Sequence, residues 1–244
     1  MLDRKYHDSC FPPKRNRTLW RYMDLWKFLN MIENRKLIFV RADQFEDNYE
    51  GMLPKKNVHL LCAPTSPSKK LPRPKEQTVK IMEQMKKTMF ISSWHIGKHE
   101  SAAMWKLYCN NNDGIAIRSD YTALVNALDK SKLISRTTVV KYIDYDHDVF
   151  PTDNLFCRFT HKRRSFAHEK ELRAIILPAE SDLTTMFKDY TTLGVDIDPD
   201  ELIKSIYVAP TAPEWFGVLL EKIVQRYKLK IPVVRSKLYD RPLY

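Results

Sequence analysis

Two glutamates separated by one residue stand in the segment HEKELRAIIL, residues 168–177. Residues 171–177 are typical of a strand, and strand side chains alternate between two faces, so Glu169, Glu171 and Arg173 are expected to share one face. Two carboxylates beside a guanidinium are suited to proton transfer or to stabilising a developing positive charge. On this segment alone, the solvated face of an antiparallel strand is the favoured interpretation.

Two further motifs combine polar and aromatic side chains. FISSWH, residues 90–95, ends an apolar strand with serines that are suited to bonding a sugar or amide, followed by an indole suited to stacking on a flat ring. A strand running out into a turn explains the same letters. In LWRYM, residues 19–23, the planar fork of Arg21 is suited to pairing with a phosphate. The alternative for Arg21 is a surface side chain lying over aromatic rings.

Charge is clustered along the chain. The acidic loop at 41–51 has carboxylates suited to Mg²⁺ or Ca²⁺ but lacks the spacing of a known metal loop, so capped turns and solvated acids are the default and no metal site is predicted. A basic segment starts in a predicted helix at 155–166 and indicates either a polyanion-binding surface or a solvated helix face. Its basic residues are Arg158, Lys162, Arg163, Arg164, Lys170 and Arg173, with His161 and His168 interleaved.

The elements expected to position these residues mix strands and helices without a regular βαβ period. This mixture favours an α+β fold with mostly antiparallel sheets flanked by helices. Strands are predicted at 19–23, 37–40, 89–95, 115–118, 137–145, 171–177, 203–208 and around 233. Helices are predicted at 25–34 with Asp24 as N-cap, at 76–87, after a Ser101 cap, and at 121–128, 155–166 and 214–227. We expect one domain over 1–244, with an exposed Pro/Lys-rich loop at 63–75.

Composition excludes several classes of protein. The chain has 244 residues, a net charge of +11 and five glycines, none close enough to another to make a phosphate loop or a dinucleotide fingerprint. Walker-type nucleotide hydrolases and Rossmann dehydrogenases are therefore excluded. No apolar run approaches the ~20 residues of a membrane span, and the first residues lack a signal-peptide core, so a cytoplasmic protein without a membrane partner is expected. The four scattered cysteines indicate reduced, partly buried thiols.

Four segments in a fixed order resemble a large family of bacterial proteins of unknown function, several of them encoded near phage-defence genes. The segments are RYMDLWKFLNMIENRKLIFVRADQFEDNYEG, FISSWH, MWKLYCNNNDGIAI and FAHEKELRAII, and the resemblance spans residues 19–208. A more distant resemblance is to ADP-ribosyltransferases of the arginine–serine–glutamate type. An arginine on the first strand, a Ser-rich middle strand and a late E-x-E carry it. These enzymes bind NAD without a glycine-rich loop, and the resemblance implies their fold.

The resemblance implies an NAD-dependent ADP-ribosyltransferase or NAD glycohydrolase that acts as a toxin-like effector in anti-phage defence. Glu171 would be the catalytic acid, and Glu169 would orient or deprotonate the acceptor. Residues expected to bind NAD, as substrate, are Arg21, Tyr22, Ser92, Ser93 and Trp94. Residues expected to contact the rest of the substrate are Arg163, Arg164, His168, Arg173, Trp105 and Tyr108.

The partners expected from this interpretation are a protein or nucleic-acid acceptor and an antitoxin or defence-system protein. Two alternatives remain open at this point. One is a metal-dependent nuclease that uses Asp43, Asp47 and Glu50 together with the E-x-E carboxylates. The other is a non-enzymatic module whose positive charge grips nucleic acid.

Overall fold

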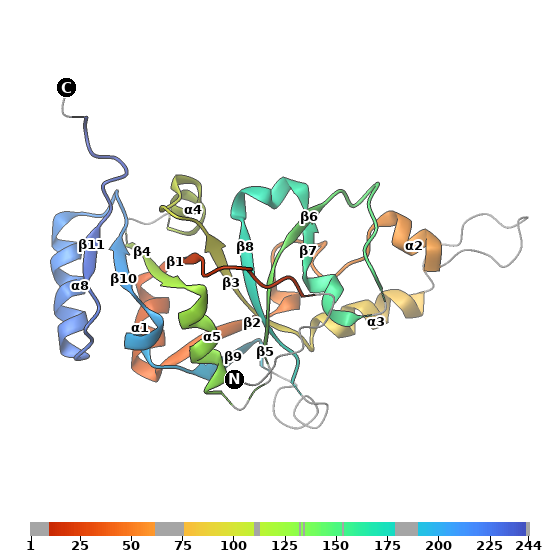
Figure 1. Ribbon diagram of the computed structural model, residues 1–244, viewed down its shortest axis with the longest axis horizontal. Helices are drawn as coiled ribbons and strands as arrows, with labels where there is room; N and C mark the ends of the chain where they lie inside the picture. The colour runs from red at the N-terminus through yellow and green to blue at the C-terminus, as the bar shows by residue number, and fades with distance from the viewer. Residues whose placement is uncertain are drawn as a thin grey trace, which may run out of the picture. The chain divides into compact units, whose positions relative to one another are not determined.

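The computed structural model describes two compact units of one chain (Figure 1). The described residues are 10–61, 76–109, 113–131, 133, 135–152, 154–178 and 190–242. The predicted loop at 63–75 and Cys62 lie outside them. Unit 1 comprises residues 1–12, 39–92 and 134–193, and unit 2 comprises residues 13–38, 93–133 and 194–244. The strands that have residues in both units are β2 (Lys36–Arg41), β3 (Phe90–Ile96) and β9 (Thr192–Asp196).

Unit 2 is a sheet in the order β11-β10-β4-β1-β3, antiparallel except for the β10–β11 pair. Its strands besides β3 are β1 (Thr18–Asp24), β4 (Gly114–Asp120), β10 (Ser205–Val208) and β11 (Val233–Arg235). Its helices are α1 (Leu25–Asn34), α4 (Ala102–Tyr108), α5 (Tyr121–Asp129), α7 (Pro199–Leu202) and α8 (Glu214–Arg226). In Figure 1, α8 lies alongside β11.

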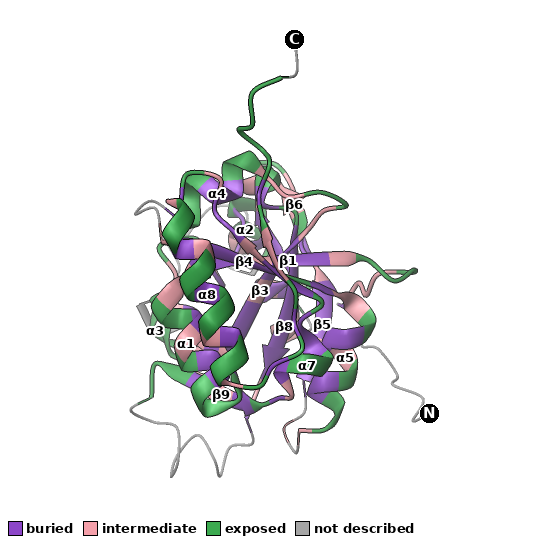
Figure 2. Ribbon diagram, turned by 90° about the vertical axis from the view of Figure 1, so that its left-hand side faces the viewer, coloured by how far each residue is buried: buried purple, intermediate pink, exposed green. Residues whose placement is uncertain are grey.

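The helices of unit 2 follow their sequence signals. In α1, Phe28 and Ile32 are buried one turn apart, as the helical periodicity predicts. Asp24 occupies the predicted N-cap position, but its carboxylate bonds the Lys27 ammonium at 3.0 Å instead of a backbone N–H. Ser101 caps α4 as predicted, because its side chain accepts a hydrogen bond from the Met104 N–H. Figure 2 shows the buried side of α8 as a purple stripe on an exposed green helix.

Unit 1 contains two sheets and several short helical turns. Its strands besides β2, β3 and β9 are β5 (Ser135–Val139), β6 (Lys141–Ile143), β7 (His161–Arg163) and β8 (Glu171–Ile176). Its helices are η1 (Ala42–Gln44), α2 (Lys55–Leu61), α3 (Glu76–Lys86), η2 (Leu155–Phe159) and η3 (Arg164–Glu169). β8 pairs antiparallel with β5 and also bonds β3, while β6 and β7 form a separate parallel pair.

All six residues of β8 are buried. The core beside β8 contains Met89, Ile91, Phe159 and Ile175. A strand covered in this way cannot present a solvated face, which matters because β8 carries two of the candidate site residues.

The prediction of an α+β fold with mostly antiparallel strands is confirmed. The strand predicted at 137–145 is interrupted after Val139, where β5 gives way to β6 in the second sheet. Cys10, Cys109 and Cys157 are buried free thiols, as expected. Within the described ranges, no helix is both long and apolar enough to cross a lipid bilayer.

The helix predicted at 155–166 is wrong. The chain makes one short helical turn over η2, an extended segment over β7 and a second turn over η3. The Asn154 side chain caps the first turn at the Phe156 N–H, 2.7 Å away, and the Thr160 hydroxyl bonds the Cys157 carbonyl at 3.1 Å. Beyond Thr160, pairing with β6 and the attraction of Lys162 to buried carboxylates replace helical hydrogen bonds.

Candidate active site

Five ionisable side chains of unit 1 meet in a group that we call the charge cluster. Its members are Glu50, Lys162, Glu169, Glu171 and Arg173. Each residue is less than 8% exposed, and Arg173 is fully buried. The interpretation of Glu171 and Arg173 as a solvated strand face is therefore wrong, because β8 is buried along its whole length.

The Arg173 guanidinium bonds two carboxylates and uses all of its N–H donors. Its Nη1 and Nη2 bond the two Glu50 oxygens at 2.7 and 2.9 Å, in the bidentate arrangement that suits a guanidinium. Its Nε bonds Glu171 at 2.8 Å, its Nη2 also reaches Glu171 at 3.3 Å, and its Nη1 donates to the Phe159 carbonyl at 3.0 Å. A guanidinium has five N–H donors, and all five are engaged here. Arg173 therefore positions the carboxylates and has no donor left for a bound anion.

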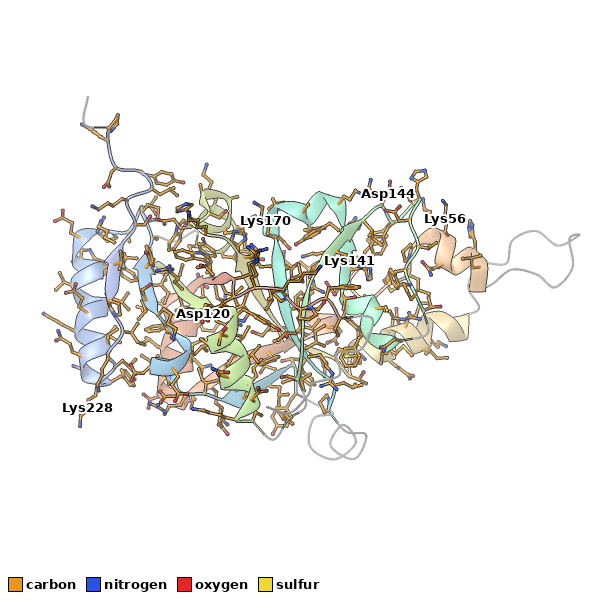
Figure 3. The ribbon with its side chains drawn as sticks, viewed as in Figure 1. Lys56, Asp120, Lys141, Asp144, Lys170 and Lys228 are labelled. Carbon is orange, nitrogen blue, oxygen red and sulfur yellow. The ribbon has the colours of Figure 1, made fainter. Side chains whose placement is uncertain are left out.

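Lys162 bridges the two glutamates of the E-x-E motif. Its Nζ lies 2.5 Å from Glu169 Oε2 and 2.9 Å from Glu171 Oε1. Glu169 is the last residue of η3, and Lys170 follows in the left-handed region with φ 44°. The two glutamates therefore meet across a bend, rather than by alternation along one strand as predicted. Figure 3 labels Lys170 at this bend.

The two glutamates have opposite pKa shifts. Burial, followed by the hydrogen bond to Glu171 and its charge, raises the pKa of Glu169 to about 7 despite the opposing effect of Lys162. Burial alone would also raise the pKa of Glu171, but the charges of Arg173 and Lys162 outweigh it and hold that pKa well below its usual range. At neutral pH, Glu171 is an anion, and Glu169 is the carboxyl of the pair that titrates nearer to neutrality. Two carboxyl groups whose pKa values are shifted in opposite directions form an acid–base pair.

The small β6–β7 sheet brings two groups to this pair. Its parallel register places Tyr142 opposite Lys162. The Tyr142 hydroxyl accepts a hydrogen bond from the Glu171 backbone N–H at 2.8 Å. Burial and then the charge of Glu171 raise the pKa of Tyr142, so the phenol keeps its proton.

A group of aromatic and basic side chains around Arg163 lies in the same unit. The Arg163 guanidinium bonds Asp47 at 2.7 Å and lies over the rings of Tyr49 and Phe166, 4.2 and 5.3 Å from their centres. Tyr49 is 44% exposed. The predicted substrate contacts Arg164 and His168 are exposed, and Arg163 is half-buried; their role stays a prediction.

Arg21 and Trp94 lie on one face of the β1–β3 pair in unit 2. The register that pairs Trp20 with His95 sets them opposite each other, and the guanidinium lies 5.8 Å from the indole centre. Burial lowers the pKa of Arg21 to about 10, so the side chain is charged at neutral pH. Trp94 is 1% exposed, so the indole predicted to stack on a flat ring is a core residue.

Tyr22 and Ser93 lie on the opposite face of this strand pair, because neighbouring residues alternate. Tyr22 packs against Trp105 with ring centres 5.0 Å apart, and its hydroxyl accepts from the Ser101 N–H at 2.7 Å. Trp105, 3% exposed, donates its indole N–H to Glu100 at 2.8 Å. Both rings are therefore packed in unit 2.

The predicted site residues are distributed over both units. Glu169, Glu171 and Arg173 meet in unit 1, where Ser92 is also fully buried. Arg21, Tyr22, Ser93, Trp94, Trp105 and Tyr108 belong to unit 2, where Tyr108 is 45% exposed. The structure adds two residues to the site that the sequence did not assign to it, namely Lys162 and Tyr142. It also brings in Glu50, which only the nuclease alternative had grouped with the E-x-E carboxylates.

Three of the four acids of the 41–51 loop are already paired with arginines. Asp43 bonds Arg41 at 2.7 Å, Asp47 bonds Arg163, and Glu50 bonds Arg173. No group of three or more metal-ligating side chains occurs among the residues that the structure describes. Asp43, Asp47 and Glu50 therefore serve as acceptors for arginine.

Comparisons with known proteins give a weak structural likeness. No protein-family model and no curated protein matches the chain. Solved structures of Thermus sp. 2.9 DarT in complex with NAD+ and with ADP-ribosylated ssDNA align over 93% of this chain and 98% and 97% of DarT, at 9% identity. Their TM-scores are 0.43 and 0.42, and a TM-score below 0.5 does not establish a shared fold.

Proposed function

We propose that this protein cleaves NAD at the nicotinamide–ribose bond and transfers ADP-ribose to an acceptor or to water. The observation that carries the proposal is the Glu169–Glu171 pair, one carboxylate fixed as an anion and the other titrating near neutrality. Such a pair supplies the charge and the base that glycosyl transfer needs. The order of arginine, serine and E-x-E elements in the sequence points to NAD as the donor.

In the proposed reaction, the bond between ribose C1′ and the nicotinamide nitrogen breaks, and its electron pair leaves with neutral nicotinamide. The positive charge that develops on the ribose is stabilised by the Glu171 anion more strongly in the transition state than in the ground state. The acceptor then bonds to C1′ and its proton passes to ionised Glu169.

We further propose that the acceptor is a nucleic acid or a protein and that the activity is toxin-like, restrained by an antitoxin or another defence-system partner. Exposed Lys170 and Arg164, the latter paired with Asp148, offer positive charge to such an acceptor. Exposed His168 and half-exposed Phe166 of the same segment offer aromatic rings. Growth arrest on induction of the wild-type gene, absent with Glu171→Gln, is the expected cellular result.

The experiment that tests the reaction measures nicotinamide release from NAD by purified protein, with and without protein, RNA and DNA acceptors. Glu171→Gln is expected to lower the rate by about 10²–10³. Glu46→Gln is the matched control, because Glu46 is an exposed carboxylate in the same unit. Absence of nicotinamide release with every acceptor, or equal rates for wild type and Glu171→Gln, would refute the proposal.

The same experiment separates the alternatives. A binding module would retain salt-sensitive nucleic-acid binding and show no NAD cleavage. A metal-dependent nuclease is disfavoured by the arginine partners of Asp43, Asp47 and Glu50.

A further inference from the structure

The charge cluster does not balance when every member is ionised. Glu50, Glu169 and Glu171 carry three negative charges against the two positive charges of Lys162 and Arg173. One proton makes the cluster neutral. Because an uncompensated charge is costly at sites this deeply buried, the cluster is expected to keep that proton near neutral pH.

We propose that Lys162 is the positioning residue that sets how tightly Glu169 holds this shared proton, and therefore how readily Glu169 is ionised and able to accept a proton from the acceptor. The inference deepens the proposed function and rests on it for the step in which Glu169 accepts a proton. Lys162 acts through the two carboxylates and needs no contact with the substrate.

The geometry around Lys162 supports this role. The ammonium contacts one oxygen of each glutamate, at 2.5 and 2.9 Å, and therefore stabilises both negative charges at once. Pairing of β7 with β6 fixes the backbone of Lys162, and the ammonium also lies 4.5 Å from the centre of the Phe166 ring. A lysine anchored in this way is a fixed charge rather than a mobile surface cation.

Groups from every neighbouring element bear on the proton. β8 supplies Glu171 and Arg173, the turn after η1 supplies Glu50 through its bidentate bond to Arg173, and β6 supplies the phenol of Tyr142. Exposed His168 and Lys170 flank Glu169 in sequence. Among the charged groups around it, Glu171 disfavours ionisation of Glu169, and Lys162 favours it.

This charge balance predicts opposite effects for two substitutions. Lys162→Met removes a cation, so Glu169 should hold its proton to a higher pH than in the wild type. Glu50→Gln removes an anion that does not touch Glu169, so Glu169 should lose its proton at a lower pH. A purely structural role for Lys162 predicts no such reversal of sign. Lys162→Arg keeps the charge and should stay close to the wild type.

The test is a carboxyl ¹³C NMR titration of the full-length protein labelled at glutamate, with the Glu169 signal assigned by its loss in Glu169→Gln. We expect its midpoint to rise by about one pH unit in Lys162→Met, to fall by a similar amount in Glu50→Gln and to stay within about half a unit in Lys162→Arg. Nicotinamide release measured against pH should move in the same directions.

A Lys162→Met midpoint that is unchanged or lower, or a Lys162→Arg midpoint that matches Lys162→Met, overturns the proposal. If Lys162→Met does not fold, Glu50→Gln decides, and a midpoint that fails to fall overturns the charge balance. If the NMR midpoints shift as expected but wild type releases no nicotinamide, the role of Lys162 toward the proton stands and the NAD reaction is what fails.

Discussion

Removing Glu50 should destabilise unit 1 severely, because it leaves a fully buried guanidinium with a single carboxylate. Glu50→Ala eliminates two charge-assisted bonds to Arg173, of 2.7 and 2.9 Å. At about 1.5–3 kcal/mol each, their loss amounts to about 3–6 kcal/mol, in line with the 3–5 kcal/mol typical of breaking a buried ion pair. For a chain of this length the melting temperature should fall by about 6–20 °C.

The choice of assay follows from where the tryptophans lie. All five belong to unit 2, so their fluorescence does not report directly on unit 1. Urea unfolding is therefore best followed by far-UV circular dichroism. Glu46→Ala removes an exposed carboxylate from the same loop and should change stability by less than about 0.5 kcal/mol. If Glu50→Ala loses less than about 1 kcal/mol and resembles Glu46→Ala, the Arg173 clamp does not stabilise the unit.

Three further predictions concern single positions. The pKa of Glu169 is raised to about 7 in the folded state, so the unfolded state loses this proton first as pH rises, and the free energy of unfolding should fall by about 1–3 kcal/mol between about pH 4.5 and 7. Glu169→Gln should lack that fall in denaturant unfolding, and identical pH profiles for the two proteins would contradict the assignment. Lys170→Val should lower the free energy of unfolding by about 1–2 kcal/mol, because a β-branched residue is strained at φ 44°. Lys170→Asn should stay within about 0.5 kcal/mol of the wild type in the same measurement. Equal losses in the two variants would rule out backbone strain. Ser101→Ala should lower the stability of unit 2 by about 1 kcal/mol in a tryptophan-monitored urea titration, because the α4 cap is lost. Ser101→Asn should retain most of that stability. Unfolding midpoints equal to the wild type in both variants would refute the cap.

Local patterns in the sequence predicted the elements whose signals are local. The apolar spacing of 25–34, 121–128 and 214–227 predicted three helices that the structure contains as α1, α5 and α8. The closeness of Glu169 and Glu171 was also expected from the sequence. The bend that produces it was not, because nothing in the letters HEKEL marks Lys170 for a left-handed conformation.

The interactions that were not predicted are long-range. Lys162 was assigned to a basic helix because its neighbours are basic, whereas carboxylates from η3 and β8 hold it in an extended segment. Glu50 was grouped with other carboxylates as a possible metal ligand, yet its partner is Arg173, 123 residues away. Trp94 was read as a stacking residue because of its polar neighbours, and its burial depends on what packs over the strand. The spacing of apolar residues along the chain gives no information about these long-range partners.

The separation of Glu50 and Arg173 along the chain affects when their contact forms during folding and synthesis. Contacts between residues so far apart require closure of a large loop and are slow to form. Lys162, Glu169, Glu171 and Arg173 all lie beyond residue 160, so a ribosome-bound chain that stops before β8 has no acid–base pair. We therefore expect the proposed activity to appear only after synthesis has passed β8, so that unfinished chains are harmless to the cell that makes them.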